Sequence, residues 1–91
     1  MKLCFTQGGW RDYQHWVDTD RAVLAKVNNL IEDVRRRPFA GVGKPEPLRG
    51  DLAGWWSRRV TGEHRLVYRV QPKAVDQRIH IAACRYRHGG G

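Results

Sequence analysis

The chain has 91 residues, of which 41% are hydrophobic, and 17 Lys and Arg against nine Asp and Glu give it a net charge of +8. This length predicts one small domain, residues 1–88, followed by a flexible glycine tail, residues 89–91. No apolar run approaches the ~20 residues of a membrane span, and the N-terminus lacks the apolar segment of a signal peptide. We therefore expect a cytoplasmic protein with an anionic partner: a phosphate backbone, an anionic membrane or an acidic protein.

The cysteines and histidines argue against a cofactor. Cys4 and Cys84 stand at opposite ends of the chain, and without export we expect reduced, buried thiols rather than a disulfide. The four histidines are scattered, and no Cys/His cluster has metal-ligand spacing. We therefore expect neither a zinc site nor another cofactor.

The first part of the chain predicts a strand and a short helix. "KLCFT" (2–6) is an apolar-rich segment that "QGG" ends. In "WRDYQHWV" (10–17), Trp10, Tyr13 and Trp16 recur at helical spacing. We interpret this aromatic face as a packing surface rather than a platform for nucleic-acid bases.

Residues 18–39 contain the clearest helix. We expect Asp18 or Thr19 to cap its start, with Asp20 in the first turn. Pro38 ends it, after three arginines (35–37) that suit the negative end of the helix dipole. Its apolar side chains form a single stripe, and burying each contributes roughly 1.5–3 kcal/mol: Val23, Val27, Leu30, Ile31 and Val34.

Residues 40–54 are rich in Gly and Pro and predict an irregular connection. A loop of this length in a small domain is usually either functional or disordered. Glu46 lies in it between Pro45 and Pro47, which restrict their neighbours to extended backbone. Its carboxylate is therefore held on a stiff scaffold that suits chemistry.

From residue 55 the hydrophobic period is two, which predicts three strands at 55–60, 64–70 and 78–86. "TGE" (61–63) is a tight turn, and residues 71–77 link the last two strands. Leu66 and Tyr68 point to one face of the second strand, and Arg65 and Arg69 to the other. The prediction is an α+β domain: an N-terminal strand, two helices, then an antiparallel sheet with the helices packed on one face.

The second half also holds residues that could cleave RNA, which carries its own nucleophile, the 2′-OH. Cleavage needs a base for the 2′ proton, cations for the anionic phosphorane and an acid for the leaving 5′ oxygen. Glu46, an arginine cluster and His88 could supply these roles, and Tyr86 or a Trp could stack on a base. Each of these residues also has an interpretation without a catalytic role. Glu46 would then be a solvated carboxylate, the arginines surface or ion-paired cations, and His88 a solvated imidazole. The cluster contains one lysine, Lys44, beside the arginines Arg49, Arg58, Arg59, Arg65, Arg69, Arg85 and Arg87.

Several stretches, in this order, resemble the Txe/YoeB branch of the RelE superfamily of bacterial toxins: "WRDYQHW", "RRPFAGVGKPEPL", "WSRR", "EHRLVYRV" and "CRY". The resemblance runs from Met1 to about Tyr86. It implies a microbial-RNase α+β fold and a metal-independent endoribonuclease that cuts mRNA in the ribosomal A site and inhibits translation. It also implies a YefM-type antitoxin as partner, beside the ribosome and mRNA, and no membrane; a homodimer stays open.

The resemblance assigns roles residue by residue. It implies Glu46 as the general base, Arg65 as the transition-state cation and Arg59 as a second phosphate contact. Lys44 and Arg49 fall in the flanking basic segment, and Tyr86 and Arg87 in the closing motif. All of these residues other than Glu46 and Arg65 are expected to bind substrate.

The end of the chain departs from the family pattern, which closes Arg-Tyr-His-Tyr with the His as general acid. Here the order is Arg85-Tyr86-Arg87-His88, so that Arg87 occupies the acid's place in an ungapped alignment. An arginine, with a pKa above ~12, donates no proton at neutral pH. Either His88 is the substitute acid, or the chain is a weakened toxin that binds ribosome and antitoxin without efficient cleavage. A DNA-binding regulator is a third option, although no recognition-helix signature stands out.

Overall fold

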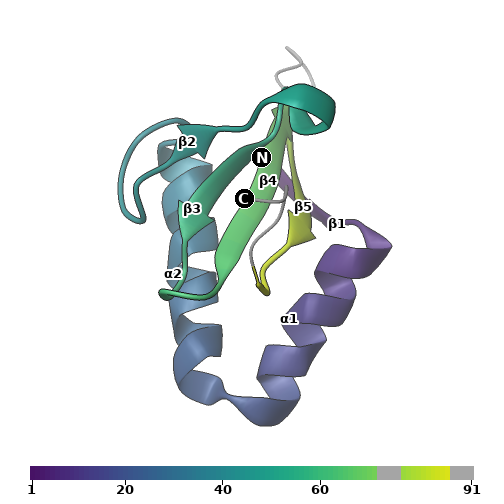
Figure 1. Ribbon diagram of the computed structural model, residues 1–91, viewed down its shortest axis with the longest axis vertical. Coiled ribbons are helices and arrows are strands. Elements are labelled where there is room, and N and C mark those ends of the chain that lie inside the picture. Colours follow the sequence, from purple (N-terminus) through teal and green to yellow (C-terminus); the bar gives the residue numbers. More distant parts are fainter. Residues whose placement is uncertain (72–76, 87–91) are drawn as a thin grey trace.

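A five-stranded sheet forms one layer of the molecule, and a pair of helices forms the other (Figure 1). The computed structural model describes residues 1–71 and 77–86. The strands lie in the order β1-β5-β4-β3-β2. Their bounds are β1 Lys2–Phe5, β2 Glu46–Pro47, β3 Trp56–Arg59, β4 Arg65–Gln71 and β5 Arg78–Ala83; the helices are α1 Gln7–Thr19, α2 Arg21–Arg36 and the 3₁₀ helix η1 Gly50–Leu52.

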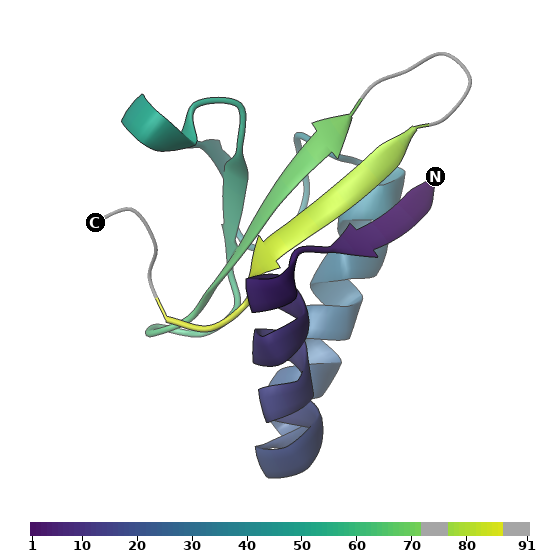
Figure 2. The same cartoon turned by 90° about the vertical axis from the view of Figure 1, so that its right-hand side faces the viewer.

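The predicted α+β architecture is confirmed, and both helices lie on one side of the sheet (Figure 2). The sheet is mixed rather than wholly antiparallel. β2 to β5 pair antiparallel, whereas the N-terminal strand pairs parallel with β5, with Leu3 opposite Ile79. The parallel pair arises because β1 and β5 lie at opposite ends of the chain, a pairing that hydrophobic periodicity does not encode.

A single aspartate joins the two helices. Asp20 has extended backbone, φ −155°, and its Oδ1 accepts hydrogen bonds of 3.1 Å from the amides of Ala22 and Val23. The expectation that Asp18 or Thr19 caps the second helix was wrong, because both residues still belong to α1 and the Thr19 hydroxyl donates back to the His15 carbonyl. α1 itself is capped by Thr6, whose hydroxyl accepts from the Gly9 amide at 3.0 Å.

The core lies between α2 and the helix-facing side of the sheet. Four members of the predicted α2 stripe are buried, and Val23 is partly buried against them. The aromatic face of α1 divides: Trp16 is buried and donates from Nε1 to the Cys84 carbonyl at 2.9 Å, whereas Trp10 is 48% exposed. The strand residues in this core are Leu66, Tyr68, Val70, Ile79 and Ile81.

Both cysteines are free thiols. Cys84 is buried, and its burial together with the nearby Asp12 charge raises the pKa of the thiol to about 12. Cys4 is half-buried rather than buried as expected, because it lies on β1 at the edge of the sheet. In the parts of the chain that the structure describes, no helix is long and apolar enough to cross a membrane.

The segment 40–54, predicted as irregular, contains two short elements. Glu46 and Pro47 form β2, in which Glu46 lies opposite Ser57 of β3. Residues Gly50–Leu52 then form η1. Two residues, of which the second is a proline, carry no strand pattern of their own, and the extended backbone becomes a strand only because β3 supplies its partners.

Candidate active site

The face of the sheet that points away from the helices carries the predicted site, and we call it the open face (Figure 2). Side chains alternate along each strand, so Ser57 and Arg59 of β3 lie on the opposite side from Arg58. On β4, Leu66 and Tyr68 are buried against the helices. The open face therefore carries Glu46, Ser57, Arg59, Arg65, Val67 and Arg69.

The structure brings Glu46 and Arg65 into contact. Arg65 Nη2 donates to Glu46 Oε1 at 2.9 Å, so the ion pair crosses β3 from β4 to β2. Arg65 Nε donates to the hydroxyl of Ser57 at 2.7 Å. The Ser57 side chain is buried, the Arg65 side chain is 21% exposed and the Glu46 side chain is 60% exposed. The carboxylate is therefore open to a ligand, whereas the guanidinium is held at two points.

Arg59 adds a second cation on the same face. It lies directly opposite Arg65 in the β3–β4 register, and its side chain is exposed. Its backbone amide donates to the Gly43 carbonyl at 2.7 Å, which ties β3 to the segment just before Glu46. Two guanidinium groups and one carboxylate thus lie over three adjacent strands.

A buried arginine anchors the segment that leads to Glu46. Arg58, fully buried on the helix side of β3, donates to the carbonyls of Arg37 (2.5 Å), Ala40 (2.6 Å) and Val42 (3.2 Å). Its guanidinium also pairs with Asp33 at 2.6 Å. Arg58 is therefore not part of the exposed cation cluster, although the sequence pattern had assigned it there. Strict alternation within "WSRR" was the signal for this inward orientation.

Asp33 completes this anchor. Hydrogen bonds from Arg37 and Arg58 hold the pKa of the Asp33 carboxyl well below its usual range. The same carboxylate accepts from the Val42 amide at 3.1 Å. Behind this anchor the backbone turns sharply, with φ of +83° at Gly43 and +52° at Lys44, before it enters β2. A Cβ at Gly43 would lie 3.0 Å from the Arg59 carbonyl oxygen, so the tight approach also favours glycine.

The end of the described chain is pinned beside Arg65. The Tyr86 amide donates to His64 Nδ1 at 2.7 Å, and the Tyr86 carbonyl accepts from the Arg65 amide at 3.2 Å. Tyr86 has a φ of +58°, and its ring is 54% exposed beneath the Arg85 guanidinium. Sequence reasoning assigned no role to His64, because its partner is 22 residues away.

The remaining predicted residues fall into two groups. Lys44 and Arg49 are exposed and flank β2 on its two sides. Arg87 and His88, the candidates for the acid's place, lie outside the described residues. Within residues 1–71 and 77–86 there is no group of three or more His, Cys, Asp and Glu side chains that could hold a metal ion.

The arrangement provides a base and cations at one point. A carboxylate can take a proton from a substrate hydroxyl, and adjacent guanidiniums can bind the oxygens of a phosphate. Because Ser57 and Glu46 hold Arg65 before any ligand arrives, little reorganisation is needed for that guanidinium to meet developing negative charge. The open face therefore suits chemistry on a phosphodiester that carries its own nucleophile.

Comparison with known proteins agrees with this geometry. Residues 5–88 match the model of the YoeB-like toxin of bacterial type II toxin–antitoxin systems. Toxin YoeB of Escherichia coli K12 is 52% identical over 88 residues, which cover 97% of this chain and 100% of that protein. The solved YoeB/ParE toxin from Agrobacterium tumefaciens superposes with a TM-score of 0.92 at 51% identity, covering 97% of this chain and 100% of its own.

Structures from Staphylococcus aureus are also similar. A YoeB dimer superposes with a TM-score of 0.86 at 36% identity, and a heterotetrameric YoeB–YefM toxin–antitoxin complex with 0.85 at 35%; each covers 97% of this chain and 98% of that chain. Sequence and structure lead to one conclusion: the chain belongs to the YoeB-like toxin family of bacterial type II toxin–antitoxin systems.

Proposed function

We propose that this toxin is an endoribonuclease that cleaves mRNA in the ribosomal A site and so inhibits translation. The observation that carries the proposal is the contact of 2.9 Å between Glu46 Oε1 and Arg65 Nη2 on the open face, with Arg59 opposite Arg65. The membership of the YoeB-like toxin family supports it.

The reaction follows from these groups without a metal ion. Glu46 removes the proton of the ribose 2′-OH, and the 2′ oxygen attacks the adjacent phosphorus. Arg65 and Arg59 bind the equatorial oxygens of the phosphorane, where negative charge accumulates. The bond from phosphorus to the 5′ oxygen then breaks, and that oxygen takes a proton from an acid. The products are a 2′,3′-cyclic phosphate and a 5′-OH.

Proton donation to the leaving 5′ oxygen depends on the residues at the end of the chain. His88 is our candidate, because Arg87 holds its proton too tightly to donate it. Tyr86 supports the assignment, since its backbone is bonded to His64 and to the amide of Arg65. Tyr86, two residues before His88 in the sequence, thus lies next to the proposed transition-state cation. Lys44 and Arg49 are proposed to bind flanking phosphates.

Primer extension on programmed ribosomes tests these roles. Glu46→Ala and Arg65→Ala should each lower the cleavage rate by about 10²–10⁴-fold, the usual contribution of a general base or of preorganised charge. Arg36→Ala, which removes an exposed cation from the last turn of α2, is the matched control and should cut like the parent. If the Glu46 and Arg65 variants also cut at the parent rate, the proposed roles are wrong.

The Arg85-Tyr86-Arg87-His88 ending favours a second candidate, a toxin that binds ribosome and antitoxin but cleaves slowly. A variant that restores the histidine of the family pattern discriminates between an efficient and a slow ribonuclease. Arg87→His should raise the cleavage rate by about 10²-fold if the acid step is impaired. A parent that already cuts as fast as Arg87→His excludes the slow-toxin candidate.

The partners are proposed from the relatives. The Staphylococcus aureus toxin is complexed with YefM in one structure and is a dimer in another. We propose that a YefM-type antitoxin with an acidic contacting segment covers the open face of this chain, and that the free toxin forms a homodimer. Light scattering over a dilution series tests the proposed homodimer. A mass of one chain at every concentration would contradict it.

A further inference from the structure

A second ligand-sized feature lies on the open face, away from Glu46. It is a depression of about 490 Å³ lined by Thr6, Trp55, Arg69, Gln71 and His80, which we call the Trp55 depression. Arg69 lies directly opposite His80 in the β4–β5 register, so the two side chains share a face. Arg65 and Arg69 stand four residues apart on β4, about 14 Å along the strand. The depression therefore lies on the same face of the sheet as the candidate active site, further along β4.

The lining of the Trp55 depression has the chemistry of a nucleotide site. Trp55 is a half-buried aromatic ring, and Arg69 is an exposed guanidinium. His80 Nε2 and Gln71 Oε1 are 3.0 Å apart, so two hydrogen-bonding side chains are fixed along one edge. Aromatic rings stack on nucleobases, and guanidiniums bind phosphate. The lining residues that belong to the described part of the chain are all neutral or positively charged, which complements a polyanion.

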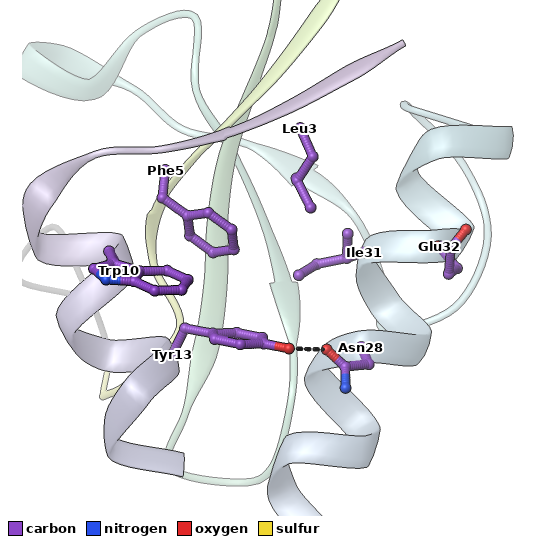
Figure 3. Close-up of a pocket in the computed structure, with 7 residues that line it drawn as sticks. All are labelled: Leu3, Phe5, Trp10, Tyr13, Asn28, Ile31 and Glu32. Atoms are coloured by element: carbon purple, nitrogen blue, oxygen red, sulfur yellow. Dashed lines mark hydrogen bonds between the residues drawn. The ribbon is translucent and has the colours of Figure 1, made fainter. Parts of the chain in front are cut away.

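A groove on the opposite side of the sheet provides a contrast. It lies on the helix side of the sheet between β1, α1 and α2, and Figure 3 shows Phe5, Trp10 and Tyr13 along it. The rings of Trp10 and Tyr13 are stacked, and Phe5 meets Trp10 edge-on. The charged side chain at its rim is a carboxylate, Glu32 (Figure 3). This groove suits an apolar side chain rather than a phosphate, and nothing in the structure indicates what covers it. The charge of the lining residues thus distinguishes this groove from the Trp55 depression.

We propose that the Trp55 depression is a nucleotide subsite, which binds a base and phosphate of the same RNA strand that Glu46 and Arg65 cleave. Trp55 stacks on the base, Arg69 pairs with the phosphate, and Gln71 and His80 meet the polar edge of the base. The proposal rests on the proposed ribonuclease function, since it places a flanking nucleotide of that substrate. The subsite adds affinity for RNA that extends beyond the scissile bond.

The test compares RNAs of different length. The probe is a fluorescein-labelled dinucleotide with a 2′-O-methyl group in place of the attacking hydroxyl, together with the same RNA lengthened by three nucleotides on its 5′ side or its 3′ side. The parent protein should bind one of the two longer RNAs at least about 10-fold more tightly than the dinucleotide, the gain that one stacked base and one phosphate contact supply.

Variants of the lining residues test whether the Trp55 depression supplies this gain in affinity. Trp55→Ala and Arg69→Ala should each remove most of the 10-fold preference and leave the dinucleotide affinity unchanged. Arg69→Ala should also lower the slope of log affinity against log salt by about one, because one phosphate contact is lost. Trp55→Phe keeps a stacking ring and should restore the preference, which separates recognition from a folding defect. Arg36→Ala on α2 is the matched charge control and should bind every RNA like the parent.

The outcomes separate this proposal from the proposed function. If Arg65→Ala abolishes cleavage but Trp55→Ala and Arg69→Ala bind the longer RNA as the parent does, the active site stands and the subsite is excluded. A parent that binds all three RNAs equally also overturns the subsite. If Arg69→Ala weakens binding of an acidic peptide but of none of the RNAs, the depression belongs to a protein partner and the proposal fails.

Discussion

At the scale of single residues, the buried serine of "WSRR" controls the candidate transition-state cation. Ser57 lies between Glu46 and Arg65, opposite the first in the β2–β3 register and bonded to Nε of the second at 2.7 Å. We expect no contact between the Ser57 hydroxyl and a substrate, because the hydroxyl is buried under the Arg65 guanidinium. We therefore regard Ser57 as a positioning residue for Arg65.

Ser57→Ala should lower kcat of ribosome-dependent cleavage by about 10-fold with little change in KM. The physical reason is that the guanidinium keeps its charge but loses one of its two anchors, so reorganisation is needed in the transition state. A double-mutant cycle measures whether the effect acts through Arg65. In an Arg65→Lys background, which lacks the Nε donor, Ser57→Ala should have no further effect. An undiminished loss of kcat in that background would show that Ser57 acts by another route.

At the scale of elements, the two-residue strand β2 depends on an anchor that lies on the far side of the sheet. Arg58 and Asp33 bind the backbone between residues 37 and 42, and β2 begins four residues later. Charges this deeply buried cost stability unless every polar atom is paired, and here the guanidinium meets three carbonyls, a carboxylate and the Tyr68 hydroxyl. The loop that carries Glu46 is thus fixed by the core.

The lowered pKa of Asp33 predicts how stability depends on pH. Because the folded protein holds this carboxyl ionised more strongly than the unfolded chain, the ion pair contributes fully above the ordinary aspartate pKa of about 3.9. That contribution decreases progressively as the pH falls from this value toward the lower pKa of the folded state. At pH 7, Asp33→Asn should cost about 3–5 kcal/mol, since it leaves Arg58 buried without its counter-ion.

Urea unfolding of the parent and of Asp33→Asn at pH 7 and pH 3 measures the difference. The gap in unfolding free energy between them should narrow at the lower pH. The control is Glu32→Gln, which breaks the exposed pair with Arg35 and should cost at most about 0.5 kcal/mol at either pH. A gap of equal size at both pH values would mean that Asp33 is not the titrating group.

At the scale of the whole molecule, the two faces differ in character. The helices cover one face of the sheet (Figure 2), whereas Arg59 of β3 and Arg65 and Arg69 of β4 lie on the other. With a net charge of +8, the chain should attract an acidic antitoxin over several ångströms before contact. The proposed antitoxin and the proposed RNA strand would then compete for the same open face.

Stopped-flow binding to the cognate antitoxin measures this attraction. Raising the salt concentration from 50 to about 500 mM should lower the association rate at least 10-fold, while the dissociation rate changes far less, because screening acts mainly on long-range steering. Arg59→Ala should slow association, whereas Arg36→Ala on the helix side should not. Equal association rates at low and high salt would argue against an electrostatic encounter on the open face.

Much of this molecule follows from local pattern alone. The spacing of Val27, Leu30, Ile31 and Val34 determines a helix with one buried side, and alternation in "HRLVYRV" assigns Arg65 and Leu66 to opposite faces of a strand. Both rules work because one period of backbone geometry sorts apolar from polar side chains. The resemblance to the family motifs adds the proposed roles of Glu46 and Arg65, although not the distance between them.

Tertiary structure alone decided the contacts that make the site. Glu46 meets Arg65 across 19 residues of sequence, Arg58 meets Asp33 across 25 and Tyr86 meets His64 across 22. Each contact depends on strand register and loop closure, which are properties of the paired sheet rather than of any single segment. Local pattern therefore determined which face Arg65 and Arg69 occupy, and only the folded sheet determined which carboxylate, carbonyl or hydroxyl each buried or half-buried arginine binds.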